Sequence, residues 1–137
     1  MIPENELIIR VGISALIGLL IGLERELRRA PAGLRTHILV AIGSTLFTLS
    51  SFLSADPSPS RIASNVVVGI GFLGGGVIYK HKDTVKGLTT AANLWVVAAL
   101  GLLVGLGEYP LAFTGTTIVL ISLIGGLIFE RKSLRTK

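Results

Sequence analysis

Charged residues of both signs gather in one short part of the sequence. Glu24, Arg25 and Glu26 are consecutive, and Arg35 follows nine residues later. Arginine suits an ion pair with a carboxylate because its planar fork can donate two hydrogen bonds to it. At helical spacing Glu24 points about 160° away from Glu26, so the two carboxylates serve different partners. We expect one of them to pair with Arg35. The alternative is an ordinary cluster of charges that only sets the orientation of the chain in a membrane.

Polar side chains also interrupt apolar sequence further along the chain. Thr89 and Asn93 are four residues apart and share a helix face, with Thr90 beside them, and Asn65 stands in an earlier apolar stretch. Hydrogen bonds between helices are the simplest role for such residues, at about 0.6 kcal/mol each in a membrane. A role in holding a ligand is the alternative.

The sequence has none of the patterns that would indicate an enzyme. It contains no cysteine, no phosphate-binding loop and no nucleophile elbow, and the GxGxxG match at 69–74 lies within an apolar stretch. His37 and His81 lie near the ends of apolar stretches, where we expect them to be interfacial. No catalytic residue, metal site or cofactor follows from these residues, and carboxylates are absent from the middle of every apolar stretch.

The elements that must position these residues are long and apolar. The chain has 137 residues, half of them hydrophobic and only 15% charged, which excludes disorder and departs from the composition of soluble domains. Stretches of 17 to 20 residues can cross the hydrocarbon core as helices. We therefore predict one all-α integral membrane domain over 1–137, a bundle of about five transmembrane helices with spans near 7–23, 36–53, 62–79, 88–106 and 110–129.

The placement of Lys and Arg predicts the orientation of this bundle. Alternate connections and the C-terminal tail carry 11 of the 13 basic residues, whereas the opposite side has only Arg10 and Arg61. The positive-inside rule then places the N-terminus and Asp56 outside and Lys137 in the cytoplasm. The basic segments would lie against anionic lipid headgroups, so nucleic acid is not the expected partner. Glu4 and Glu6 stand where a signal peptide would be basic, so we expect the first span to be retained.

Glycine is frequent within the predicted spans. Small residues let membrane helices approach closely, and the simplest reading is the packing of one bundle. A dimer face, or a locally unwound segment that lines an ion path, are the alternatives, the latter favoured by the run at 74–76 because glycine weakens a helix by about 1 kcal/mol per residue. The candidate packing residues are Gly18, Gly22, Gly69, Gly71, Gly74, Gly76, Gly101 and Gly105.

Four blocks of the sequence resemble the membrane domain of the MgtC/SapB family of bacterial inner-membrane proteins. They are GLERE at 22–26, GLRTH at 33–37, GIGFLG at 69–74 and GLTTAA at 87–92, followed by Trp95, Gly101, Gly105, Gly107 and Tyr109. The resemblance implies a multi-pass protein of the inner membrane that is linked to adaptation to low magnesium. Longer members add a cytoplasmic C-terminal domain, and we expect this chain to be the short form without it.

The resemblance leaves two hypotheses about function. The first is a non-enzymatic protein that regulates a membrane complex, such as F-type ATP synthase or a cation transporter, through helix–helix contacts. The second is an oligomer that conducts Mg²⁺, and Mg²⁺ is the one ion that the resemblance suggests the protein could bind. We favour the first, expect a homo-oligomer, most simply a dimer, and predict that Glu24, Arg25, Glu26 and Arg35 form the functional centre.

Overall fold

The computed structural model of the chain describes residues 2–53 and 58–134. Asp56 and Lys137, which the orientation prediction uses, lie outside the described residues. Within these described residues, five helices and one short hairpin follow each other: α1 (Glu4–Leu27), α2 (Leu34–Phe52), α3 (Pro59–Gly76), β1 (Tyr79–His81), β2 (Thr84–Lys86), α4 (Leu88–Leu106) and α5 (Tyr109–Leu134).

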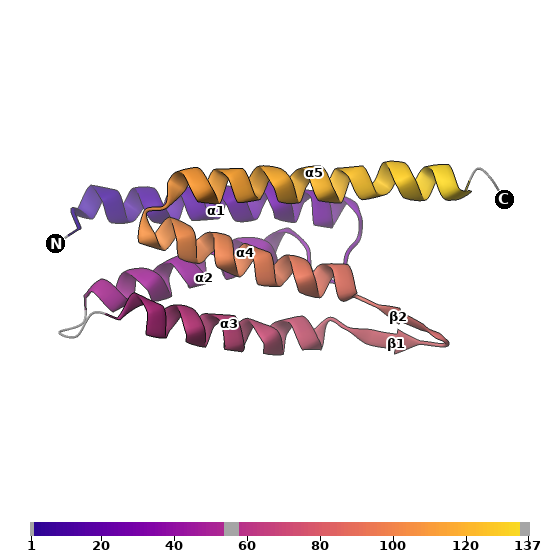
Figure 1. The fold of residues 1–137 in the computed structure, drawn as a ribbon, viewed down its shortest axis with the longest axis horizontal. Coiled ribbons are helices and arrows are strands. Elements are labelled where there is room, and N and C mark those ends of the chain that lie inside the picture. The colour runs from indigo at the N-terminus through magenta and orange to yellow at the C-terminus, as the bar shows by residue number, and fades with distance from the viewer. Residues whose placement is uncertain (1, 54–57, 135–137) are drawn as a thin grey trace.

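The helices run alternately up and down along one common direction (Figure 1). As a result the α1–α2 connection, the hairpin and the C-terminal end of α5 all lie at the same end of the bundle. We call this end the basic end, because the connections there contain Arg28, Arg29, Lys80, Lys82 and Lys86. The N-terminus and the α4–α5 turn lie at the opposite end (Figure 1).

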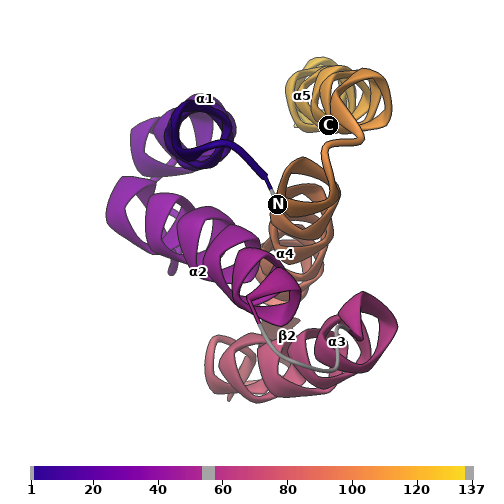
Figure 2. The same cartoon turned by 90° about the vertical axis from the view of Figure 1, so that its left-hand side faces the viewer.

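Helices α1, α2 and α4 form the centre of the bundle. Helix α2 packs against both α1 and α4, while α3 packs mainly on α4 and α5 flanks α4 and α1. Viewed from one end, α3 and α5 lie on opposite sides of this central group (Figure 2). The buried core between the central helices includes Ile17 and Ile21 of α1, Ala41 of α2, and Val97 and Val104 of α4.

Each of the five predicted apolar stretches forms a helix. By length and composition, α1, α4 and the part of α5 at Tyr109–Gly126 could each cross a membrane. Helices α2 and α3 are 19 and 18 residues long and contain several polar residues, among them Arg35 and His37 in α2 and Arg61 and Asn65 in α3. Polar side chains are costly in the hydrocarbon core of a membrane, so they favour positions inside the protein or at the membrane surface.

A β-hairpin replaces the end of the third predicted span. Helix α3 ends at Gly76, three residues before the predicted boundary, and Tyr79 lies in a strand that pairs antiparallel with β2. Consecutive glycines are poor helix formers, and the following Val77-Ile78-Tyr79 run favours extended backbone. Gly87 returns the chain to α4 at φ +90°, and a Cβ there would lie 1.9 Å from the carbonyl oxygen of Val77.

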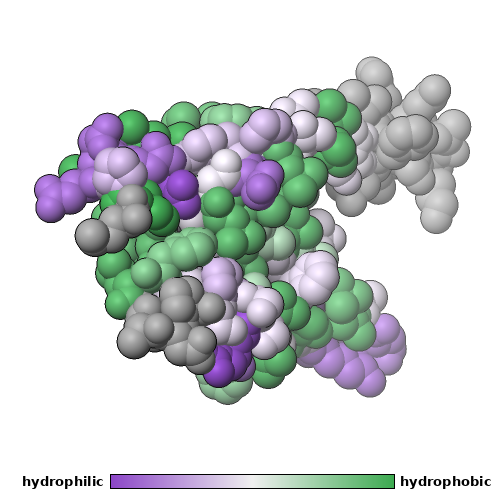
Figure 3. Space-filling view, turned by 60° about the vertical axis from the view of Figure 1, so that its left-hand side comes forward, coloured by the Kyte–Doolittle hydropathy of each residue, from purple (hydrophilic) through white to green (hydrophobic). Residues whose placement is uncertain are grey.

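Large apolar side chains cover much of the outer surface. Phe72 on α3 is 86% exposed and Ile118 on α5 is 61% exposed. Apolar residues dominate the middle of the face shown in Figure 3, and hydrophilic ones gather toward the ends. A water-soluble domain rarely exposes apolar patches of this extent, so the surface is that of a membrane protein. Trp95 on α4 is also 53% exposed.

Candidate functional site

A group of buried polar residues joins the three central helices near the basic end. His37 of α2 is fully buried, and Asn93 of α4 is 5% exposed. Asn93 Nδ2 lies 3.1 Å from His37 Nε2, and His37 Nδ1 lies 2.8 Å from the carbonyl oxygen of Gly33. His37 is therefore an interior residue that connects two helices of the bundle.

Helix α1 adds an ion pair to the same end of the bundle. Arg25 Nη2 donates a hydrogen bond of 3.4 Å to Thr90 Oγ1 on α4, and Arg25 Nη1 lies 3.6 Å from Glu24 Oε2. Glu24 Oε1 accepts a hydrogen bond of 2.7 Å from Arg28 Nε. The side chains of Glu24 and Arg25 are only 12% and 11% exposed. We call Glu24, Arg25, His37, Thr90 and Asn93 the polar cluster.

Two atoms of the polar cluster are buried without a hydrogen-bond partner in the structure. They are Glu24 Oε2 and Arg25 Nε. Leaving a buried polar atom unpaired costs roughly 1–3 kcal/mol, and more when the group is charged. The cluster therefore keeps an acceptor and a donor that another polar group could satisfy.

The other two members of the predicted charge cluster lie elsewhere. Glu26 Oε2 accepts a hydrogen bond of 3.0 Å from the backbone nitrogen of Leu34, so this carboxylate caps the first turn of α2. Arg35 is exposed and forms no ion pair among the described residues. The expected pair between Arg35 and a glutamate is thus not formed, because Glu24 faces Arg25 and Arg28 while Glu26 turns toward the start of α2.

Of the polar residues predicted within the spans, some are buried in the bundle and others are exposed. Thr90 and Asn93 face the interior of the bundle, whereas Thr89 is exposed on the outer face of α4. Asn65 is exposed on α3 and borders the groove described below. The shared helix face that the spacing predicts for Thr89 and Asn93 does not give them the same surroundings.

Four of the predicted packing glycines lie where two helices are so close that no side chain fits between them. A Cβ on Gly18 would lie 2.7 Å from the carbonyl oxygen of His37, and one on Gly22 would lie 2.9 Å from the Cα of Leu34. A Cβ on Gly101 would lie 2.4 Å from the carbonyl oxygen of Ala41, and Gly105 meets Thr48 as closely. These glycines serve contacts of α2 with α1 and with α4 inside one chain.

The glycines of α3 have different surroundings. A Cβ on Gly74 would be in ordinary contact with Ala91 at 3.7 Å. Added Cβ atoms on Gly69, Gly71 and Gly76 would meet nothing within 4 Å. The glycine-rich segment therefore presents open space along much of its length, in contrast to the glycines of α1 and α4.

A second polar group, which the sequence analysis does not single out, closes the opposite end of the bundle. Arg10 Nη1 donates a hydrogen bond of 2.6 Å to the carbonyl oxygen of Gly105, and Arg10 Nε lies 3.0 Å from Glu6 Oε1. Glu6 Oε1 also accepts a hydrogen bond from the hydroxyl of Tyr109. An arginine inside an apolar stretch is energetically costly unless it has polar partners. The position of Arg10 in the first apolar stretch could therefore have predicted a structural role for it.

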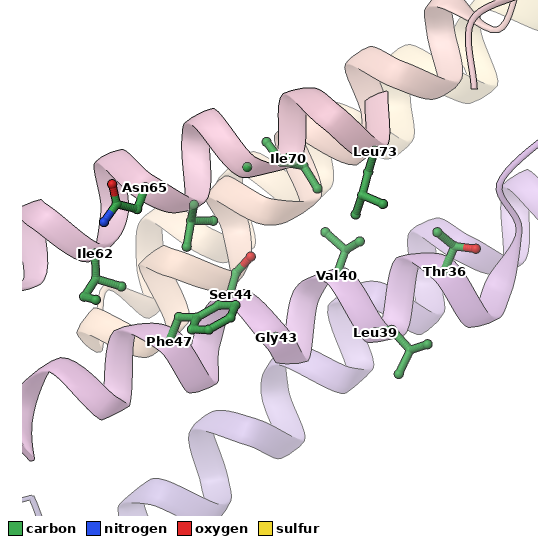
Figure 4. Close-up of a pocket in the computed structure, with 12 residues that line it drawn as sticks. Thr36, Leu39, Val40, Gly43, Ser44, Phe47, Ile62, Asn65, Ile70 and Leu73 are labelled. Atoms are coloured by element: carbon green, nitrogen blue, oxygen red, sulfur yellow. The ribbon is translucent and has the colours of Figure 1, made fainter. Parts of the chain in front are cut away.

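An elongated groove runs between α2 and α3 (Figure 4). Its volume is about 690 Å³, and its walls are mostly apolar, with Val40 and Phe47 from α2 and Ile70 and Leu73 from α3. The polar side chains that border it are Thr36, Ser44 and Asn65. Gly43 and Gly69 also line it, and an added Cβ on either would meet nothing within 4 Å.

The described residues contain no group of three or more His, Cys, Asp or Glu side chains that could hold a metal ion. Hard divalent cations prefer several carboxylate or carbonyl oxygens. Within this part of the chain the polar cluster offers one carboxylate, which is already paired with two arginines.

Comparison with known proteins identifies the family. The sequence profile of the MgtC family matches residues 11–132. This range includes every residue of the polar cluster, the whole of α4 and most of α1. The chain belongs to the MgtC family. The resemblance seen in the four sequence blocks is therefore confirmed.

Three relatives are 44–51% identical to this chain. Protein MgtC of Salmonella typhimurium is 51% identical over 77% of the chain and 46% of its own length. Protein slr0014 of Synechocystis is 49% identical over 86% of the chain and 51% of its own length. YhiD of Escherichia coli K12, whose name proposes a magnesium transporter, is 44% identical over 86% of the chain and 59% of its own length. The chain thus spans about half the length of these curated relatives, and no solved structure matches it.

Proposed function

We propose that this chain is the multi-pass membrane part of a bacterial inner-membrane protein that supports adaptation to low magnesium without catalysing a reaction. In this proposal it acts through helix–helix contacts with a larger membrane complex, such as the membrane sector of F-type ATP synthase or a cation transporter. Membership of the MgtC family and the name of YhiD support the link to magnesium. The N-terminus lies outside and the basic end faces the cytoplasm, in keeping with the charge asymmetry.

The observation that carries the proposal is the exposed face of α3. Gly71 and Gly75 lie four residues apart on one face, and an added Cβ on either would meet nothing within 4 Å. Val68 and Phe72 beside them are 78% and 86% exposed. Small residues flanked by large apolar ones allow a second membrane helix to approach closely. This face accepts a helix of the partner complex or of a second copy in a homodimer.

The polar cluster fixes the position of the α3 face through α4. Hydrogen bonds near the basic end connect α1 to α4 through Arg25 and Thr90, and α2 to α4 through His37 and Asn93. Because α3 packs on α4, the position of α4 sets the position of the α3 face. We propose that Glu24 and Arg25 act as positioning residues, with Glu26 fixing the α1–α2 connection.

A magnesium-conducting oligomer is the second candidate. The name of YhiD favours it, and so do the oxygens of Thr36, Ser44 and Asn65 along the α2–α3 groove. Partly hydrated ions can pass along rings of neutral oxygens when several subunits contribute them.

Magnesium flux separates the two candidates. Purified protein is reconstituted into liposomes that contain a magnesium-sensitive dye, and uptake is followed after external Mg²⁺ is added. We expect no uptake above that of protein-free liposomes. Saturable uptake that depends on the protein would overturn the non-conducting proposal.

A growth assay tests the positioning role of the polar cluster. In cells that depend on this protein for growth at low magnesium, Glu24→Gln and Arg25→Gln should each impair growth at normal membrane abundance. The matched controls are Glu4→Gln and Arg29→Gln, which remove the same charges from exposed positions. Normal growth of both cluster variants would reduce the cluster to an orientation signal.

A further inference from the structure

We propose that the α2–α3 groove binds one acyl chain of an anionic phospholipid, with the headgroup at the basic end beside Arg35. Side chains of α2 and α3 line the groove along both helices (Figure 4). Leu39 and Phe47 on its α2 rim are 69% and 59% exposed, and Leu73 on the α3 rim is 48% exposed. An acyl chain can therefore enter sideways from the surrounding bilayer.

The protein itself leaves the groove unfilled. Its volume of about 690 Å³ falls within the range of roughly 300–1,000 Å³ that is common for small-molecule sites. Gly43 on one wall and Gly69 on the other both face open space. Elsewhere in this bundle, glycines such as Gly101 mark backbone contact between helices. The two glycines of the groove instead provide room for a third, slender group between α2 and α3.

The chemistry of the walls selects hydrocarbon over water. A stable buried water needs two to four polar partners, and apolar cavities stay dry. The lining is mostly apolar and includes Val40, Phe47, Val66, Ile70 and Leu73. An acyl chain supplies the dispersion contacts that an empty apolar groove lacks.

The charge at the basic end selects an anionic headgroup. The groove reaches Thr36, and Arg35 precedes it, one helical turn before Leu39 on the rim. Arg35 is exposed and has no ion pair among the described residues. Lys80, which follows α3 on the other side, is exposed as well. A phosphate beside Arg35 would complete the site at the level of the membrane surface, and Lys80 adds positive charge at the same end of the bundle.

Quenching of a single tryptophan by brominated lipid tests the proposal. Trp95 is the only tryptophan, so Phe47→Trp in a Trp95→Phe background places one reporter in the groove, about 18 Å along the helix from Arg35. The protein is reconstituted in phosphatidylcholine with a small fraction of phosphatidylglycerol brominated toward the end of its acyl chains. The control reporter is Ile118→Trp on the exposed face of α5.

We expect quenching at position 47 to be at least twice that at position 118. Brominated phosphatidylcholine at the same fraction should show no such difference. Gly43→Leu with Gly69→Leu, which fills the groove, should abolish the excess quenching, whereas Gly12→Leu, at an equally open position on α1, should not. Arg35→Gln should raise the lipid fraction needed for half-quenching about fivefold, and Arg29→Gln much less.

Equal quenching at positions 47 and 118 would overturn the proposal. Equal quenching by the two brominated lipids would overturn the choice of an anionic headgroup. If the groove-filling variant changed the mass of the purified particle and left quenching intact, the groove would belong to an interface with a second copy, and the proposal would also fail.

Discussion

Asn93 Nδ2 on α4 faces His37 Nε2 on α2 at 3.1 Å, while His37 Nδ1 faces the carbonyl oxygen of Gly33 at 2.8 Å. An amide nitrogen can only donate, so with this arrangement Nε2 accepts and Nδ1 carries the proton. Both nitrogens of a fully buried ring are thereby satisfied. One asparagine thus fixes the tautomer of a histidine on another helix and joins the two helices near the basic end.

Removing this amide should destabilise the bundle. Asn93→Leu keeps a similar size but leaves His37 Nε2 without a donor, and we expect a loss of about 1–3 kcal/mol in the free energy of unfolding. Unfolding of the detergent-solubilised protein, followed by circular dichroism, measures the change. Asn65→Leu is the matched control, because Asn65 is exposed and should give little change. Equal stability of the two variants would contradict the role of the His37–Asn93 contact.

The glycines of α4 should tolerate no side chain, unlike those of α3. Gly101→Ala would place a methyl group 2.4 Å from the carbonyl oxygen of Ala41, and overpacking of this kind costs typically 1–3 kcal/mol. Gly69→Ala adds the same methyl group in open space and should be neutral or slightly stabilising, since alanine favours a helix more than glycine. Thermal unfolding of both variants in one detergent checks the contrast. Similar melting temperatures of the two variants would contradict a tight contact between α2 and α4 at Gly101.

The proposed homodimer should depend on Gly71 and not on the glycines of α1. Gly71→Leu should lower the detergent-solubilised mass from dimer to monomer while leaving the fold intact, because position 71 faces open space. Gly18→Leu should unfold the protein instead, since its side chain would strike the backbone of α2 at His37 and Ile38. Light scattering that corrects for bound detergent gives the masses. A strictly monomeric wild-type chain would contradict the dimer.

The orientation of the bundle can be tested with residues that the structure describes. Lys82 in the hairpin turn and Glu108 in the α4–α5 turn are both exposed and lie at opposite ends of the bundle (Figure 1). The chain contains no cysteine, so Lys82→Cys and Glu108→Cys each introduce a single thiol. An impermeant thiol reagent applied to intact cells should label position 108 and not position 82. Labelling of position 82 alone would reverse the proposed orientation.

Several features of this protein follow from the sequence because they depend on composition and local spacing. Five apolar stretches predict five helices, since backbone groups in an apolar environment must pair within their own segment. The boundary of the third helix could not be read in the same way. Tyr79 continues an apolar run, yet it leaves the helix because the glycines at 74–76 weaken helical backbone and a hairpin follows.

The roles of individual polar and small residues were decided by tertiary structure. Thr89 and Thr90 are adjacent and chemically alike, yet only Thr90 receives Arg25, because α4 turns one of them toward α1 and the other outward. Gly69 and Gly101 are equally small, yet one borders a groove and the other touches the backbone of α2. Glu24 meets Arg28, four residues further on the same side of α1, and the adjacent Arg25 rather than Arg35 on the next helix. Sequence spacing gives the direction of a side chain from its own helix, whereas the packing of the neighbouring helices determines what lies in that direction.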